Sequence, residues 1–259
     1  MCAAVFGCGG VGIVSAPDCV DIDSAVIAYR PAVGEQRSIL AKDAGPSDLY
    51  AAAPWRTFRW YFGQRHYSGT YWSATKHDHV IYESRLELAA LLLADFDRAV
   101  RGIAAQPFQL MAEVDGKARR HVLDYMLDTI DGPVVIDVVR RERLSKPKIQ
   151  LLCSWTRQIL DSVGWSYEIV SEPDAVRLAN IRFLAGYRRG WLVNEPILDE
   201  LRACSADLVG TSIGDAERRI VGRPLPLVRS AVLHMLWTQE FTADLNHPLE
   251  RSTILESAS

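Results

Sequence analysis

Apolar residues recur at a helical spacing after Tyr82, at positions Leu86, Ala89, Leu93, Phe96, Val100 and Ile103. A period of about 3.6 residues predicts one long amphipathic helix over this segment. The pattern then changes to short β-type runs at 108–114, 121–127 and 134–139, with turn residues at 115–116 and 131–133. These runs predict three strands, followed by a helix over 148–163 and a strand over 165–170. Their order predicts an α/β fold with a mixed sheet flanked by helices.

The pattern also divides the chain into three parts. Residues 1–54 form a weakly patterned lead-in with a β-like run at 25–29, and residues 55–190 hold the predicted α/β domain. From 191 to 259 we expect a small helical domain, with helices over 192–201, 212–221 and 225–240 and short strands over 241–245 and 252–256. Helices followed by a hairpin are typical of a winged-helix-like module.

Composition narrows the class of protein. Hydrophobic residues make up 49% and charged residues 24% of the 259 positions, which is typical of a globular chain. The longest apolar run, 88–94, is far shorter than the roughly 20 residues that span a bilayer, and no basic segment precedes an apolar core at the N-terminus. Five cysteines without a CxxC pair argue against a disulfide framework or a zinc ribbon. We therefore expect a cytoplasmic protein without a membrane partner.

Charge is unevenly distributed along the chain. The formal net charge is −3, yet residues 117–148 hold eight basic residues against five acidic ones. A locally basic segment suits a phosphate backbone, although a solvated charged face has the same composition. Lys146, Lys148 and Arg157 are candidate phosphate contacts. The aromatic and basic stretch 56–72, which includes Arg65, could line DNA or pack internally.

Three acidic residues form the candidate catalytic group. Asp124 and Asp137 lie on neighbouring predicted strands, so an antiparallel register would bring them together, and Glu83 opens the predicted helix. Carboxylates from two strands and a helix offer the oxygen ligands that Mg²⁺ or Mn²⁺ prefers. Such an ion can activate water and stabilise charge on a cleaved phosphodiester. The same acids could instead be separate turn, edge and cap residues.

Several short motifs together carry a resemblance to a known family. They are WSAT (72–75), VIYESRLE (80–87), IAAQPF (103–108), RHVLDY (120–125), VIDV (135–138), GWSYE (164–168), NIRFLAGYR (180–188), LHMLW (233–237) and TADLNHPL (242–249). Their order and spacing resemble the TnsA-like endonuclease subunit of heteromeric cut-and-paste transposases. That family belongs to the PD-(D/E)xK, restriction-endonuclease-like superfamily. The similarity runs from about residue 55 to the end of the chain.

The resemblance implies a restriction-endonuclease-like core and a role for each acid. Glu83 is similar to the helix glutamate of the metal site, Asp124 to the Asp of the PD half-motif, and Asp137 to the acid of the second half-motif. The implied reaction is Mg²⁺-dependent hydrolysis of the 5′ strand at transposon ends. The implied partners are DNA, a DDE transposase (TnsB-like) that processes the other strand, and an AAA+ regulator (TnsC-like) that contacts the C-terminal region.

The sequence departs from the family pattern at two positions. Leu123 stands at the Pro of PD, and Val139 stands at the Lys of (D/E)xK. That lysine normally positions or deprotonates the attacking water, which valine cannot do. Arg140 should point to the opposite sheet face unless the strand ends or bulges there, while Arg141 has the right parity but lies farther along. A lysine from elsewhere, such as Lys76 or Lys117, could also substitute.

Three functions therefore compete. The first is an active endonuclease subunit of a transposase. The second is a catalytically impaired subunit that binds DNA and assembles the complex, which Val139 favours. The third is a stand-alone defence or repair nuclease on the same fold.

Overall fold

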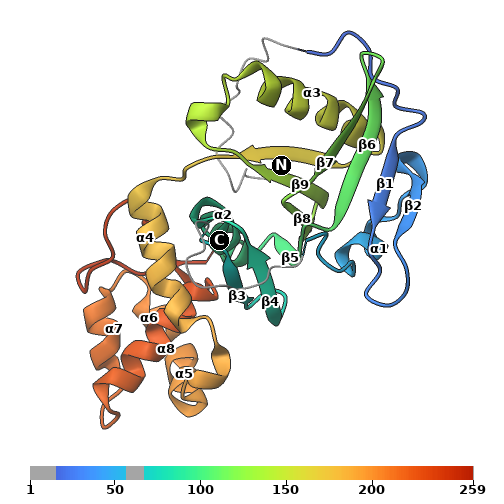
Figure 1. Ribbon diagram of the computed structural model, residues 1–259. Coiled ribbons are helices and arrows are strands. Elements are labelled where there is room, and N and C mark those ends of the chain that lie inside the picture. Colours follow the sequence, from blue (N-terminus) through green and yellow to red (C-terminus); the bar gives the residue numbers. More distant parts are fainter. Residues whose placement is uncertain (1–15, 57–66, 259) are drawn as a thin grey trace. The chain divides into compact units, whose positions relative to one another are not determined.

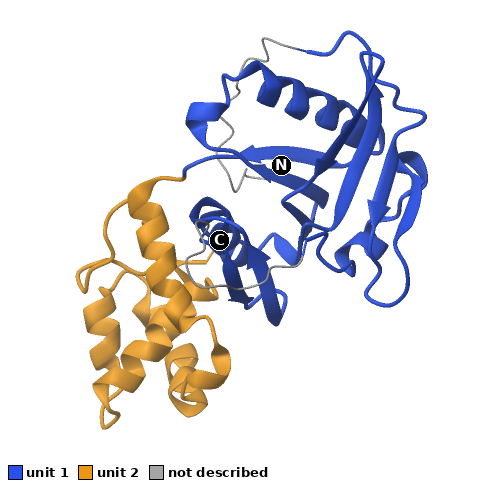
Figure 2. Ribbon diagram, viewed as in Figure 1, with its two compact units in different colours: residues 1–172 blue, residues 173–259 orange. Residues whose placement is uncertain are grey.

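The computed structural model describes residues 16–56 and 67–258. The chain forms two compact units, residues 1–172 and 173–259, which are coloured separately in Figure 2. The division falls earlier than the boundary at residue 191 expected from the sequence. The reason is that helix α4 (Ala175–Leu184) and the 3-10 turn η3 (Ala185–Tyr187) both contact helix α8 (Leu225–Trp237) in the second unit.

The first unit contains a four-stranded mixed sheet. Its order is β10-β9-β8-β5, formed by Ser166–Val170, Gly132–Val138, Tyr125–Thr129 and Val100–Ala105. Strands β9 and β10 are parallel, and the other two pairs are antiparallel. The link between β9 and β10 runs through the 3-10 turn η2 (Arg141–Arg143) and helix α3 (Pro147–Ser162), which lies along β10 (Figure 1). The predicted α/β class with a mixed sheet and flanking helices is thus confirmed.

A second sheet includes two strands from the expected lead-in. Its order is β2-β1-β6-β7, formed by Arg37–Leu40, Val26–Tyr29, Phe108–Val114 and Lys117–Val122. The 3-10 turn η1 (Ala41–Asp43) and helix α1 (Pro46–Tyr50) follow β2. Ile27, Phe108 and Leu110 from this sheet share one hydrophobic core with Trp155 and Ile159 of α3. Residues 25–50 are therefore an integral part of the first unit.

Helix α2 is shorter than the sequence predicts. It runs over Arg85–Phe96, and Asp97 leaves it in an extended conformation. Val100 and Ile103, which the apolar spacing assigned to the helix, lie instead on β5 and pair with β8. The apolar period of the helix coincided by chance with buried strand positions, and pairing with β8 decided between the two structures. Helix α2 packs against β5, β9 and the hairpin of β3 (Gly69–Ser73) and β4 (Asp78–Tyr82).

The strand predicted over 121–127 is two strands in different sheets. β7 ends at Val122 and pairs with β6, whereas β8 begins at Tyr125 and pairs with β5 and β9. The chain changes sheets at Leu123 and Asp124. This break puts Asp124 where the two sheets meet, ahead of the first residue of β8. Sequence alternation continues through the break, so periodicity alone does not reveal it.

The second unit is helical around α8. The other elements are η4 (Gly190–Leu192), α5 (Glu195–Ala203), α6 (Ser205–Leu208), α7 (Ile213–Arg219) and a two-stranded pair, β11 (Phe241–Thr242) with β12 (Glu256–Ser257). The three predicted helices are confirmed as α5, α7 and α8; the strand predicted over 241–245 is shorter, and the one predicted over 252–256 is shorter and begins only at Glu256. Helix α8 contacts α4, α5 and α7. None of the helices within 16–56 and 67–258 is long and apolar enough to cross a membrane.

Candidate carboxylate site

Asp137 lies on β9 with its side chain in the interior of the first unit. It is 2% exposed. Its Oδ2 lies 2.6 Å from Nε2 of His121 on β7 and accepts a 2.5 Å hydrogen bond from the hydroxyl of Tyr167 on β10. Burial and the charge on Asp137 raise the pKa of Tyr167 well above its usual range, so the hydroxyl keeps the proton that it donates. Oδ1 of Asp137 is buried, and the described residues give it no hydrogen-bond partner.

Asp124 stands beside Asp137, as the sequence predicts. In the β8–β9 ladder Tyr125 pairs with Ile136, so one step farther along the antiparallel register Asp124 comes opposite Asp137. Oδ2 of Asp124 accepts a 2.7 Å hydrogen bond from the backbone N–H of Val138. Its carbonyl oxygen accepts a 2.8 Å bond from the backbone N–H of Gln106. These two bonds fix the Asp124 backbone and side chain at the end of β9.

Glu87 on helix α2 is a second acid, besides Glu83, that acts on Asp124. Helix α2 begins at Arg85, and Ser84 is its N-cap, so Glu83 precedes the helix instead of opening it. Glu87 belongs to a capping box, because its backbone N–H donates to Ser84 Oγ at 3.1 Å and its Oε2 accepts the Glu83 N–H at 2.7 Å. Burial raises the pKa of Glu87, against the lowering effect of the hydrogen bonds that its carboxylate accepts from the Glu83 N–H and the Ser84 hydroxyl.

Glu83 is held on the rim of the group by two donors. Its Oε1 accepts a 2.5 Å hydrogen bond from the side-chain amide of Gln106, and Arg56 Nη1 lies 3.3 Å from the same oxygen. Gln106 itself is 4% exposed and has a φ of 45°, in the left-handed region that non-glycine residues seldom adopt. Strained residues of this kind cluster at functional sites, where the surrounding structure holds them in place.

The four acids act on one another electrostatically. The pKa of Asp124 is raised well above its usual range, first by burial and then by the charge on Asp137. Glu87 and Glu83 raise it further, while the hydrogen bond from the Val138 N–H opposes the rise. Like charges that share a site disfavour each other's ionised form, so this group gains stability from a positive charge.

The donor chemistry of the group suits a hard divalent cation. Carboxylate oxygens are the ligands that Mg²⁺ and Mn²⁺ take, and the unpaired buried Oδ1 of Asp137 is an oxygen of this kind. As the side chains lie, no three His, Cys, Asp or Glu residues of the described segments converge closely enough to hold a metal ion. The oxygens fit the ion chemically, and closing a full set of ligands would require side-chain rotation.

Strand β9 carries no basic residue that could replace the lysine of the family motif. Residues 137 and 138 pair in register with 169 and 170 of β10, and the Val139 N–H continues the pairing by donating to Val170 O at 2.8 Å. Strand β9 ends at Val138 and Arg140 is the N-cap of η2, so strand alternation does not decide which way Arg140 points. Arg141 is bound to Glu172, through its backbone N–H at 2.9 Å and its guanidinium at 3.0 Å.

The predicted DNA contacts have different surroundings. Lys146 is the N-cap of α3, Lys148 lies in its first turn, and both are exposed. Arg157 is partly buried: its Nη1 donates to Tyr167 O at 2.8 Å and its guanidinium lies 5.0 Å from the Tyr167 ring centre. That environment favours a packing role for Arg157 over a phosphate contact. Arg65 lies outside the described residues.

Comparison with known proteins does not identify a family. No family model matches the sequence, and no curated protein matches it.

Proposed function

We propose that the protein is a metal-dependent DNA endonuclease that serves as the 5′-strand-cleaving subunit of a heteromeric transposase. The observation that carries the proposal is the placement of Asp124 and Asp137 where β8 pairs with β9, with Glu83 and Glu87 at the start of helix α2, which contacts β9. Like-charged, largely buried acids on a mixed sheet fit a site for a hard cation. The resemblance of the motifs to TnsA-like subunits supplies the reaction class and the partners: transposon-end DNA, a DDE transposase and an AAA+ regulator.

Each residue has a role that its contacts support. Asp124 and Asp137 would hold the Mg²⁺ or Mn²⁺ ion, with Glu87 or Glu83 completing the oxygen ligands. When bound, the ion would lower the pKa of a water molecule and offset charge developing on the phosphodiester. The Val138 N–H fixes the Asp124 carboxylate, and the Gln106 backbone N–H fixes its main chain. Exposed Lys146 and Lys148 can position the phosphate backbone.

A second candidate function is supported by Val139. Without the strand lysine, one group that normally handles the attacking water is missing, and β9 itself carries no basic residue in its place. A subunit of this kind could bind the ion and the DNA and assemble the transposase without cutting. Metal binding would survive in both cases, so cleavage itself must be measured.

The deciding experiment is a strand-resolved cleavage assay on DNA carrying the matching transposon ends, with Mg²⁺ and the partner transposase. Wild type is compared with Asp124→Asn, Val139→Lys and the control Val139→Met, which changes the same side chain without adding a charge. Cleavage of the 5′ strand by wild type, and loss by about 100-fold or more in Asp124→Asn, supports the endonuclease.

Two other results point elsewhere. If wild type is silent and only Val139→Lys cuts, the protein is the impaired assembly subunit. If wild type cuts the same DNA equally well without the transposase, a stand-alone nuclease replaces the transposase subunit as the proposed function.

A further inference from the structure

Asp137 is bound through one of its two carboxylate oxygens only. His121 Nε2 at 2.6 Å and the Tyr167 hydroxyl at 2.5 Å both contact Oδ2. Oδ1 is buried and has no hydrogen-bond partner within the described segments. Leaving a buried charged acceptor unpaired is costly, so an arrangement that concentrates both donors on Oδ2 needs a reason.

The two donors come from different elements and are themselves held in place. His121 is on β7, and its ring makes an edge contact with Trp155 of α3 at a centroid distance of 6.3 Å. Tyr167 is on β10 and lies beneath the Arg157 guanidinium, while Arg157 also binds the Tyr167 carbonyl oxygen. Both donors therefore also contact residues of helix α3.

We propose that His121 and Tyr167 are positioning residues, which hold Asp137 so that it binds the divalent cation through Oδ1 alone. The inference rests on the proposed function, because it assigns the task of Asp137 within the same site. Hydrogen bonds from outside the ligand set commonly orient a ligating carboxylate, and losing one typically weakens metal binding by about 10- to 100-fold. The two donors occupy Oδ2 and leave Oδ1 as the oxygen available to the ion.

The test measures Mn²⁺ binding to the full chain by electron paramagnetic resonance, without DNA and without turnover. Tyr167→Phe and His121→Leu each remove one donor, while His121→Gln keeps an N–H near the position of Nε2. The matched control is Tyr50→Phe, which removes a partly buried hydroxyl that donates to Leu127 O at 3.3 Å in the same unit.

We expect Tyr167→Phe and His121→Leu to raise the Kd for Mn²⁺ by about 10-fold or more. His121→Gln should stay within about threefold of wild type, and Tyr50→Phe should bind as wild type does. Near-UV circular dichroism checks that each variant is folded. If Tyr167→Phe does not fold, the comparison of His121→Leu with His121→Gln decides the question.

Two results would overturn the inference, and they are distinguishable. If wild type binds Mn²⁺ and the folded variants bind it equally well, His121 and Tyr167 only support the fold, and the metal-dependent nuclease remains possible. If wild type binds no Mn²⁺, both the positioning role and the metal-dependent function fail.

Discussion

Asp95 on α2 is the anchor of the β3–β4 hairpin, and its replacement by asparagine should be strongly destabilising. The carboxylate is 6% exposed and accepts four hydrogen bonds. Oδ1 accepts from Ser73 Oγ at 2.6 Å and Thr75 N at 2.8 Å. Oδ2 accepts from the Tyr71 hydroxyl at 2.7 Å and Ala74 N at 3.0 Å. Every donor comes from the hairpin, so these bonds attach it to the helix.

The size of the destabilisation follows from which of the four hydrogen bonds an asparagine amide can still accept. Asparagine keeps one carbonyl oxygen, but its NH₂ group must face two of the four donors. A hydroxyl can rotate and accept from the amide, whereas a backbone N–H cannot, so at least one buried N–H loses its partner. Hydrogen bonds to charged groups contribute about 1.5–3 kcal/mol each, and an unsatisfied buried donor costs a similar amount. We expect Asp95→Asn to lower the free energy of unfolding by about 2–4 kcal/mol.

The measurement is urea unfolding of the full chain, with amide hydrogen exchange of the hairpin as a local readout. The control is Asp97→Asn at the end of the same helix, whose Oδ1 accepts one hydrogen bond, from Ala99 N at 2.7 Å. The control should cost about 1 kcal/mol or less. If Asp95→Asn costs no more than Asp97→Asn, or if hairpin exchange is unchanged, the argument from the four bonds is refuted.

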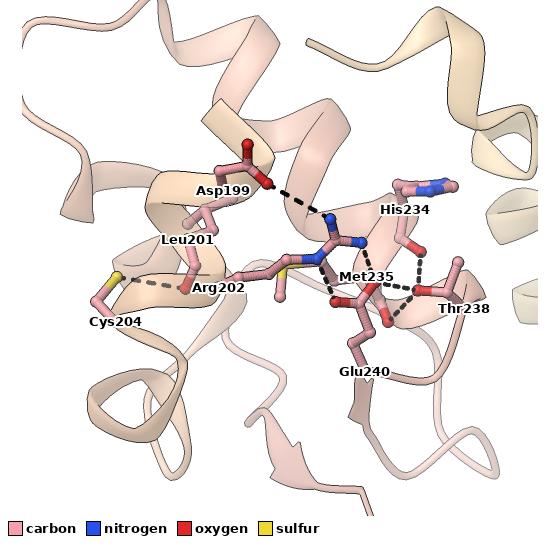
Figure 3. Close-up of polar contacts among 8 residues, drawn as sticks. All are labelled: Asp199, Leu201, Arg202, Cys204, His234, Met235, Thr238 and Glu240. Carbon is pink, nitrogen blue, oxygen red and sulfur yellow. Dashed lines mark hydrogen bonds and ion pairs between the residues drawn. The ribbon is translucent and has the colours of Figure 1, made fainter. Parts of the chain in front are cut away.

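Two further predictions concern other parts of the chain. In the second unit, Arg202 lowers the pKa of Glu240 through a bidentate pair (Figure 3), so this stabilisation is present at neutral pH and disappears as pH falls through the folded-state pKa. Glu240→Gln should lower the free energy of unfolding by about 1 kcal/mol or less at pH 7 and leave it unchanged at pH 3. A dependence of stability on acid pH that is the same in the variant and in wild type would contradict this. In the β6–β7 turn, Asp115 and Gly116 have φ values of 52° and 69°. Gly116→Ala should lower the free energy of unfolding in urea by about 1–2 kcal/mol. The control Gly186→Ala, whose added methyl group meets open space, should lower it by about 0.5 kcal/mol or less, and equal losses would refute the strain argument.

Local signals were sufficient to predict several elements of the fold. The strand 108–114 matches β6 in full, because its alternation ends at an Asp-Gly pair that suits a tight hairpin turn. Helix α3 was placed within a residue at each end, with Pro147 at its first position. Two predictions were wrong for the same reason: the helix after Tyr82 was predicted too long, and residues 121–127 were predicted as one strand. Both depend on which distant strand each segment pairs with, and periodicity does not contain that information.

The candidate site was predictable where it depended on strand register. Asp124 and Asp137 were expected to be neighbours from the turn between their strands, and the β8–β9 ladder bears this out. Glu87 was missed as a neighbour of this pair, although Ser84 three residues earlier marks a capping box and hence the true start of the helix. His121 and Tyr167 were not identified, because periodicity shows neither that β7 of the other sheet approaches Asp137 nor that β10 pairs beside β9.

The cost of the acidic group itself argues for a function at this place. Burial disfavours the charged form of Asp124, and the charge on Asp137 adds to that penalty. Apolar or amide side chains of similar size would avoid that cost, as replacements of buried ionic groups commonly do. Strand β9, Gly132–Val138, carries no Lys or Arg of its own, so the strand offers no compensating cation. Because β9 carries no basic residue beside Asp137, these carboxylates depend more on a cation from solution, which favours the proposed metal-dependent function over a purely structural role.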